Sequence, residues 1–212
     1  MKKTEFTSYD DFVNNYEVMV PECFNFAYDV VDDYAKNQPD KRALVWCDDS
    51  GEEETFNFAD MKRYSDMTAN YFKSLGIGKG DPVMLVLKRR YEFWFCILAL
   101  HKLGAICIPA THLLTKKDFI YRNNAASIKM VVTVNETEVQ DNVDAALSDS
   151  PTLTKRVTLF GKRDGWHTFH DEIESFSSEF KRPEGNEAST NQDTMLIYFT
   201  SGTTGMPKMV RH

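Results

Sequence analysis

Apolar positions along the chain follow two alternating spacings, and these predict helices and strands in turn. Between Ala59 and Leu75, apolar residues recur every three or four positions, which predicts an amphipathic helix that ends at Gly76. The segment Val83–Leu87 is apolar throughout, as is typical of a strand that is buried on both faces of a parallel sheet. The chain therefore switches from a helical period to a strand period within a few residues.

The same pattern repeats along the whole chain. It predicts strands at 43–47, 55–58, 83–87, 105–109, 129–134, 156–160 and 195–199. It predicts helices at 24–36, 59–75, 91–103, 115–126, 136–147 and 169–180, with Thr115 and Asp118 as a capping box. This alternation predicts an α/β fold, with a layered, mainly parallel sheet and helices on both faces. Residues 1–23 are expected to be a leader with one short helix, and the polar stretch 181–193 a surface loop.

Composition narrows the class of protein. The 212 residues are 42% hydrophobic and 13% aromatic, which is enough for a packed core and excludes disorder of the whole chain. A net charge of −7 argues against non-specific binding of nucleic acid. The sequence has no run of 18 apolar residues, so we expect no membrane span.

The cysteines and the N-terminal residues indicate the cellular compartment in which the protein is expected. The four cysteines lack zinc spacing and are predicted to be mostly buried free thiols: Cys23, Cys47, Cys96 and Cys107. Two lysines at the start resemble a signal peptide, but Asp10 and Asp11 occupy the place of its apolar region. We therefore expect a cytoplasmic protein.

Three segments carry chemistry-bearing residues that a structural role explains better. The glycine-rich stretch 76–81 follows a helix and precedes a strand, the reverse of a dinucleotide-binding loop, so it is predicted to be a turn. His167 and His170 have no third ligand nearby and are predicted to be surface residues rather than a metal site. The cationic stretch 88–90 could meet an anion at the end of a strand, but a solvated face is favoured.

The hydroxyl-rich loop (residues 200–208) is the strongest candidate for chemistry. Directly after the predicted strand 195–199 it combines glycines, hydroxyls and one lysine: Thr200, Ser201, Gly202, Thr203, Thr204, Gly205 and Lys208. Glycines allow a tight turn that presents backbone N–H groups, hydroxyls donate to phosphate oxygens, and Lys208 adds a positive charge. The spacing is not that of a Walker A loop, where lysine follows the second glycine directly. Composition alone leaves two interpretations open, a polyphosphate site and a flexible hairpin tip.

Residues 198–212 resemble the phosphate-binding motif of the adenylate-forming superfamily, which includes acyl-CoA synthetases. Earlier segments add to this likeness: 56–61, Gly80–Val83, His101–Pro109, 115–122 and 164–166. Segments 115–122 and 164–166, with Pro207–Met209, are most similar to medium-chain acyl-CoA synthetases. The resemblance covers 24–212.

The resemblance implies a ligase that joins a small-molecule carboxylate to AMP, using ATP and Mg²⁺, and then passes the acyl group to coenzyme A. It implies that the hydroxyl-rich loop holds the β- and γ-phosphates of ATP. Members of the superfamily are much longer, and the residues expected to bind adenine and Mg²⁺ and to catalyse the reaction lie downstream. We therefore expect residues 24–212 to be an incomplete N-terminal α/β domain with no catalytic residue of its own, inactive in isolation.

Two further expectations follow. The alternative to an enzyme fragment is a stand-alone module that binds nucleotide phosphates or a partner without catalysis. Because nothing after strand 195–199 is predicted to cover it, we also expect self-association of the chain or mobility of 200–212.

Overall fold

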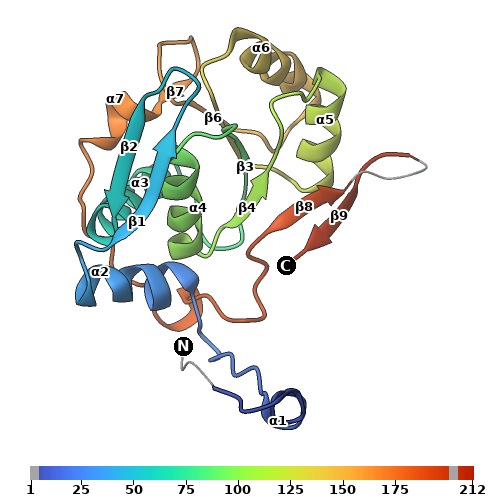
Figure 1. Cartoon of the computed structure of the whole chain (residues 1–212). Helices are drawn as coiled ribbons and strands as arrows, with labels where there is room; N and C mark the ends of the chain where they lie inside the picture. The colour runs from blue at the N-terminus through green and yellow to red at the C-terminus, as the bar shows by residue number, and fades with distance from the viewer. Residues whose placement is uncertain (1–4, 201–204) are drawn as a thin grey trace.

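A five-stranded parallel sheet forms the centre of the molecule in the computed structural model, which describes residues 5–200 and 205–212 (Figure 1). Its strand order is β4-β3-β5-β6-β7. The strands are β3 (Pro82–Val86), β4 (Ile106–Pro109), β5 (Met130–Thr133), β6 (Lys155–Thr158) and β7 (His167–Thr168). The predicted α/β class with a parallel sheet is confirmed.

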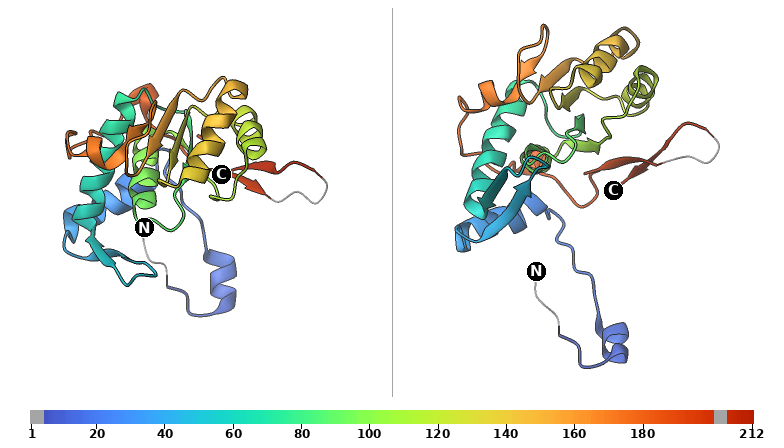
Figure 2. Two further views of the ribbon diagram at one scale, coloured as in Figure 1. Left: turned by 90° about the horizontal axis from the view of Figure 1, so that it is seen from above. Right: turned by 45° about the horizontal axis from the view of Figure 1, so that its top comes forward.

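The strand order places helices on both faces of the sheet. The chain leaves β3 through α4 (Glu92–Leu103) toward β4, then reverses through α5 (Lys116–Ala125) to reach β5 on the other side of β3. Parallel crossovers are right-handed, so this reversal moves α5 to the face opposite α4. The helix α6 (Thr137–Ala146) packs beside α5, while α3 (Phe58–Ser74) packs beside α4 (Figure 2).

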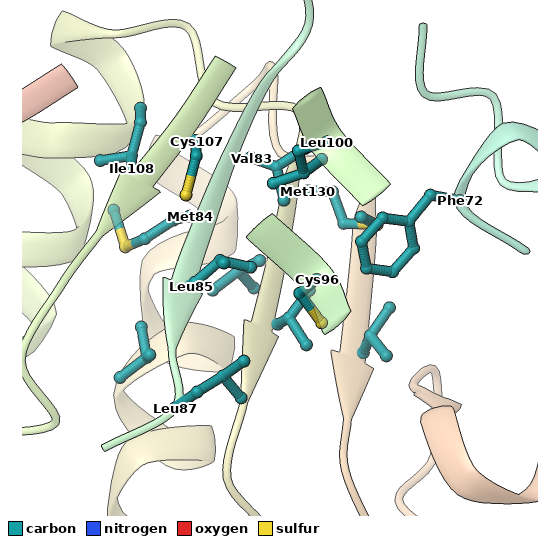
Figure 3. Close-up of a cluster of buried hydrophobic side chains, with 14 of the residues drawn as sticks. Phe72, Val83, Met84, Leu85, Leu87, Cys96, Leu100, Cys107, Ile108 and Met130 are labelled. Atoms are coloured by element: carbon teal, nitrogen blue, oxygen red, sulfur yellow. The ribbon is translucent and has the colours of Figure 1, made fainter. Parts of the chain in front are cut away.

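The main core lies between the central strands and the α3–α4 layer. Figure 3 shows Phe72 of α3 and Leu100 of α4 directed toward the sheet, in the same buried cluster as Val83 of β3 and Met130 of β5. Val83 and Met84 are fully buried, as are the residues that they pair with in β5. Burial on both faces explains why β3 is a continuous apolar run rather than an alternating one.

The N-terminal elements form a smaller core at one end of the molecule. They comprise a π-helix (Ala27–Asp32), α2 (Asp33–Asn37) and the antiparallel hairpin of β1 (Arg42–Cys47) and β2 (Glu53–Asn57). The fully buried ammonium group of Lys102 ties these elements to the main layer. It lies 2.6 Å from Asp66 of α3 and 2.8 Å from Asp32 of the π-helix.

Several predicted boundaries are wrong. The helix expected at 169–180 ends early, because α7 spans only Phe169–Ile173. The Ser175 hydroxyl donates to the carbonyl of Glu172, and such side-chain bonds compete with continuation of a helix. All four thiols are free, as predicted, but the expectation of burial holds only for Cys96 and Cys107 and is wrong for Cys23 and Cys47, which are exposed. The short strand β7 and the 3₁₀ turns Leu147–Asp149 and Gly185–Glu187 were not predicted.

The leader extends away from the body of the molecule, as Figures 1 and 2 show. Its one short helix, α1 (Tyr9–Asn15), has an exposed surface that includes Tyr9 and Val13. Among the helices of the described residues, none has the length and hydrophobicity needed to cross a membrane.

Candidate functional site

The hydroxyl-rich loop closes an antiparallel hairpin. Strand β8 (Ile197–Thr200) pairs with β9 (Lys208–Arg211), and Thr200 stands directly opposite Lys208. The strand expected at 195–199 therefore begins two residues later. The expectation that nothing after it would cover it is wrong, because β9 pairs with one of its edges.

The segment that leads into the hairpin is hydrogen-bonded to β4, the edge strand of the main sheet. The amide of Cys107 in β4 donates to the carbonyl of Met195 at 3.0 Å, and Cys107 and Leu196 form a parallel bridge. The His212 carbonyl accepts bonds from the amides of Met195 and Leu196, at 2.8 and 3.1 Å. The bonds of Met195 and Leu196 with β4 and with His212 therefore fix where β8, and with it the start of the loop, lies relative to the main sheet.

The structure describes three of the seven candidate residues in the loop: Thr200, Gly205 and Lys208. The candidates Ser201, Gly202, Thr203 and Thr204 lie outside the described residues. The Thr200 hydroxyl lies 3.5 Å from the Lys208 carbonyl, at the limit for a hydrogen bond. The Lys208 side chain is exposed, and no described carboxylate forms an ion pair with it. The two ends of the loop therefore present a hydroxyl and a positive charge on facing strands.

Helix α5 contacts the hairpin on both sides of the loop. The Tyr121 hydroxyl donates to the Pro207 carbonyl at 2.7 Å, and the Tyr121 ring meets the Phe199 ring edge-on, with 6.1 Å between centroids. The Arg122 guanidinium lies 5.2 Å from the centre of the Phe199 ring. Sequence reasoning missed these two residues as parts of the site. No periodicity could pair Tyr121 with Pro207, because 86 positions separate them.

The stretch 76–81 is a turn that Asp81 closes. The Gly78 amide donates to the Asp81 carboxylate at 2.8 Å, and Lys129 binds the same oxygen at 2.8 Å. Gly76 has a φ of 86°, a conformation that favours glycine at the end of a helix. These contacts give the turn a structural role.

From the cationic stretch 88–90 and the two histidines, only Arg90 and His170 meet at one carboxylate, that of Glu92, whereas Lys88 and His167 bind other carboxylates. Lys88, which has a φ of 50°, forms an ion pair with Glu136 at the start of α6. Arg90 is only half-buried, and its guanidinium binds the buried Glu92 carboxylate at 2.8 Å. The expectation of a solvated face therefore holds for Lys88 and Arg89, which are exposed, but is wrong for Arg90.

Each histidine has a carboxylate partner of its own. His170 Nε2 lies 2.8 Å from Glu92, while His167 Nδ1 lies 3.2 Å from Glu172. Burial raises the pKa of Glu92, but hydrogen bonds with His170 and Arg90 outweigh it, so the pKa lies below its usual value. Within 5–200 and 205–212, no three His, Cys, Asp or Glu side chains gather as a metal site would require.

Comparison with known proteins gives a consistent picture. The family model described as AMP-binding enzyme matches residues 31–212. The mitochondrial acyl-coenzyme A synthetase ACSM5 of Rattus norvegicus is 38% identical over 201 residues, covering 91% of this chain and 34% of that protein. The mitochondrial acyl-coenzyme A synthetase ACSM4 of Mus musculus is 36% identical over 212 residues, covering 96% of this chain and 36% of that protein.

A solved structure supports the fold. The anthranilate CoA ligase AuaEII, in complex with anthranoyl-AMP, superposes with a TM-score of 0.76 at 22% identity, covering 91% of this chain and 35% of that one. The chain thus spans about a third of the length of the relatives it matches.

Proposed function

The chain belongs to the family of AMP-binding enzymes, and we propose that it is the N-terminal part of an ATP-dependent acyl-CoA synthetase. The proposed enzyme joins a carboxylate to AMP with release of pyrophosphate, and then forms a thioester between the acyl group and coenzyme A. The two curated relatives named above carry the description acyl-coenzyme A synthetase, which supports this reaction class. A medium-chain carboxylate is the proposed substrate, as the likeness of segment 115–122 suggests.

The proposed role of the hydroxyl-rich loop is to hold the β- and γ-phosphates of ATP. The observation that carries it is the pairing of Thr200 with Lys208 across the two strands that close the loop. A hydroxyl donor and an exposed ammonium group on facing residues suit an anion with several oxygens. Because Lys208 has no ion-pair partner among the described residues, its charge is available for a phosphate.

The proposed Mg²⁺ would be bound mainly by the phosphate oxygens of ATP rather than by side chains of this chain. The described residues bring no cluster of carboxylates to the loop, whereas hard oxygen ligands are what Mg²⁺ prefers. The triphosphate would supply such oxygens, and Thr200 could add a hydroxyl. The bound ion would neutralise phosphate charge, while this chain orients the phosphates.

Calorimetric titration of the 212-residue chain with Mg-ATP tests the role of the loop. Lys208→Ala should weaken binding at least ten-fold, because one charge-assisted bond to phosphate is lost. Lys208→Arg should retain most of the affinity. Lys181→Ala is the matched control, since Lys181 is an exposed lysine of the remote loop 181–193. Absence of binding by the wild-type chain at millimolar ATP would refute the proposal for this chain.

Pyrophosphate exchange tests the proposed inactivity of the isolated chain. We expect no carboxylate-dependent exchange of label into ATP, because the groups that act on the carboxylate are proposed to lie downstream. Measurable exchange would show that the chain is a complete adenylating unit. Binding of ATP without exchange also fits a stand-alone nucleotide-binding module, so a longer chain that extends past His212 should be assayed beside it.

Two further proposals concern partners and location. Self-association of the chain remains proposed, because Met209 and Val210 on the hairpin are exposed; sedimentation at several concentrations tests it. A cytoplasmic location also remains a prediction, and both named relatives are described as mitochondrial. Fractionation of cells that express the protein distinguishes the two compartments.

A further inference from the structure

We propose that Tyr121 and Arg122 are positioning residues that hold the two ends of the hydroxyl-rich loop in register for phosphate. The inference rests on the proposed function, since it assigns the loop the same task. It adds helix α5, a separate element, to the machinery of the site. Three observations support the proposal. Helix α5 is held in place by its own packing, Tyr121 bonds to the C-terminal end of the loop, and Phe199, at the N-terminal end of the loop, contacts α5.

Helix α5 is a rigid support. The Asp118 carboxylate accepts bonds from the amide and hydroxyl of Thr115, at 2.9 and 2.7 Å, which fixes the first turn. One face of the helix is anchored in the interior, where Phe119 is fully buried and Asn123 donates to the Ser150 hydroxyl at 3.1 Å. Tyr121, between these two anchors in sequence, reaches the hairpin instead.

The Tyr121 bond acts on the peptide group that leads into Lys208. The carbonyl of Pro207 and the amide nitrogen of Lys208 belong to one planar unit. A hydrogen bond from the Tyr121 hydroxyl to that carbonyl, at 2.7 Å, therefore sets the orientation of the whole unit. The proline ring already fixes φ at Pro207, so few backbone rotations remain between α5 and the proposed phosphate ligand.

The second contact lies at the other end of the loop. Phe199 immediately precedes Thr200 and meets both Tyr121 and Arg122 of α5. The Arg122 side chain is only 11% exposed and lies 3.3 Å from Asp118, one helical turn earlier, which holds the guanidinium over the ring. Both ends of the loop therefore contact consecutive residues of a single helix.

The experiment compares the wild-type chain with Tyr121→Phe and Arg122→Met. Tyr9→Phe is the control, because Tyr9 is an exposed tyrosine of α1 in the leader, outside the hairpin and α5. The first measurement is amide hydrogen exchange at 205–212, which needs no ligand. The second is calorimetric binding of inorganic tripolyphosphate with Mg²⁺, which probes phosphate recognition without a nucleoside.

If the proposal is correct, Tyr121→Phe speeds exchange at 205–212 about five-fold and weakens tripolyphosphate binding by a similar factor, as expected for loss of one neutral hydrogen bond. Arg122→Met should weaken binding further than it speeds exchange, because a cation is lost as well. Tyr9→Phe should change neither. Exchange that is the same in wild type and both α5 variants overturns the proposal.

Faster exchange with unchanged tripolyphosphate affinity also overturns it, since α5 would then only stabilise the hairpin. If the wild-type chain binds no tripolyphosphate, the proposed function fails for this chain. Hydrogen exchange then decides whether α5 holds the loop at all. The two failures are therefore distinguishable.

Discussion

His101 should make the fold sensitive to acid. Its side chain is 8% exposed on α4, and neither ring nitrogen has a hydrogen-bond partner among the described residues. Burial lowers the pKa of His101 from 6.5 to about 4, because the interior offers the charged ring no compensation. In the unfolded chain the imidazole is solvated and keeps its ordinary pKa, so the unfolded state binds more protons between these two values.

The difference between the folded and unfolded pKa of His101 sets the sign and the size of the change in unfolding free energy with pH. Stability contributed by the neutral ring is complete above about pH 7 and is lost as the pH falls through the unfolded pKa of 6.5 toward the folded pKa. The full loss is about 3 kcal/mol, and about 2 kcal/mol of it falls between pH 7 and pH 5. Carboxylates that are stabilised in the fold add to acid sensitivity, so a variant is needed to isolate His101.

Urea unfolding of the wild type and His101→Leu at pH 7 and pH 5 measures how much of the acid-induced loss of stability comes from His101. The variant cannot titrate at this position, so it should lose about 2 kcal/mol less than the wild type between the two pH values. His112→Leu, outside the α4 core, is the control and should follow the wild type. Equal losses in the wild type and His101→Leu would refute the reasoning, because the buried ring would then accept a proton at no cost.

Two further substitutions test buried charge. Lys102→Met should destabilise the fold by about 3 kcal/mol or more in urea unfolding, because Asp66 and Asp32 lose the ammonium group that they share, and the buried Asp66 keeps only the partly exposed Lys62 as an ion-pair partner among the described residues. Adding Asp66→Leu should restore much of the loss, and failure to restore it would show that the cost was packing. Glu92→Gln should destabilise at pH 7, because it breaks the bonds with Arg90 and His170, and this destabilisation should shrink as the pH falls through the lowered pKa of Glu92, where protonation weakens the same bonds in the wild type. A destabilisation by Glu92→Gln that does not change as the pH is lowered would contradict that ion-pair account.

The sequence predicted the elements of the sheet well because each carries its own periodic signal. The run 83–87 matches β3 to within one residue, and the predicted cap at Thr115 lies directly before α5. The strand β9 escaped prediction because Lys208–Arg211 has no apolar alternation and becomes a strand only by pairing with β8. The buried Lys102 cluster escaped for a similar reason, since an ordinary helical lysine is buried here only because Asp32 and Asp66 lie beside it.

The candidate site was predictable only in part. The loop composition and its likeness to a known motif made Thr200 and Lys208 candidates, and the structure places these two residues opposite each other; their binding of phosphate stays a prediction. The sequence around Tyr121 and Arg122 gives no signal that they contact the hairpin, because these contacts depend on how the chain reverses after β4. A single sequence encodes such a contact only through the complete fold.

The strand order of the sheet also constrains how the protein is made on the ribosome. β3 emerges first among the five strands, yet both of its neighbours, β4 and β5, are synthesised after it. The apolar segment 83–87 therefore stays open on one edge until Thr133 has left the ribosome tunnel, however quickly the local helices form. During that interval the nascent chain carries an apolar strand with an unpaired edge, so a chaperone that binds apolar segments would protect it while residues 83–133 are being synthesised.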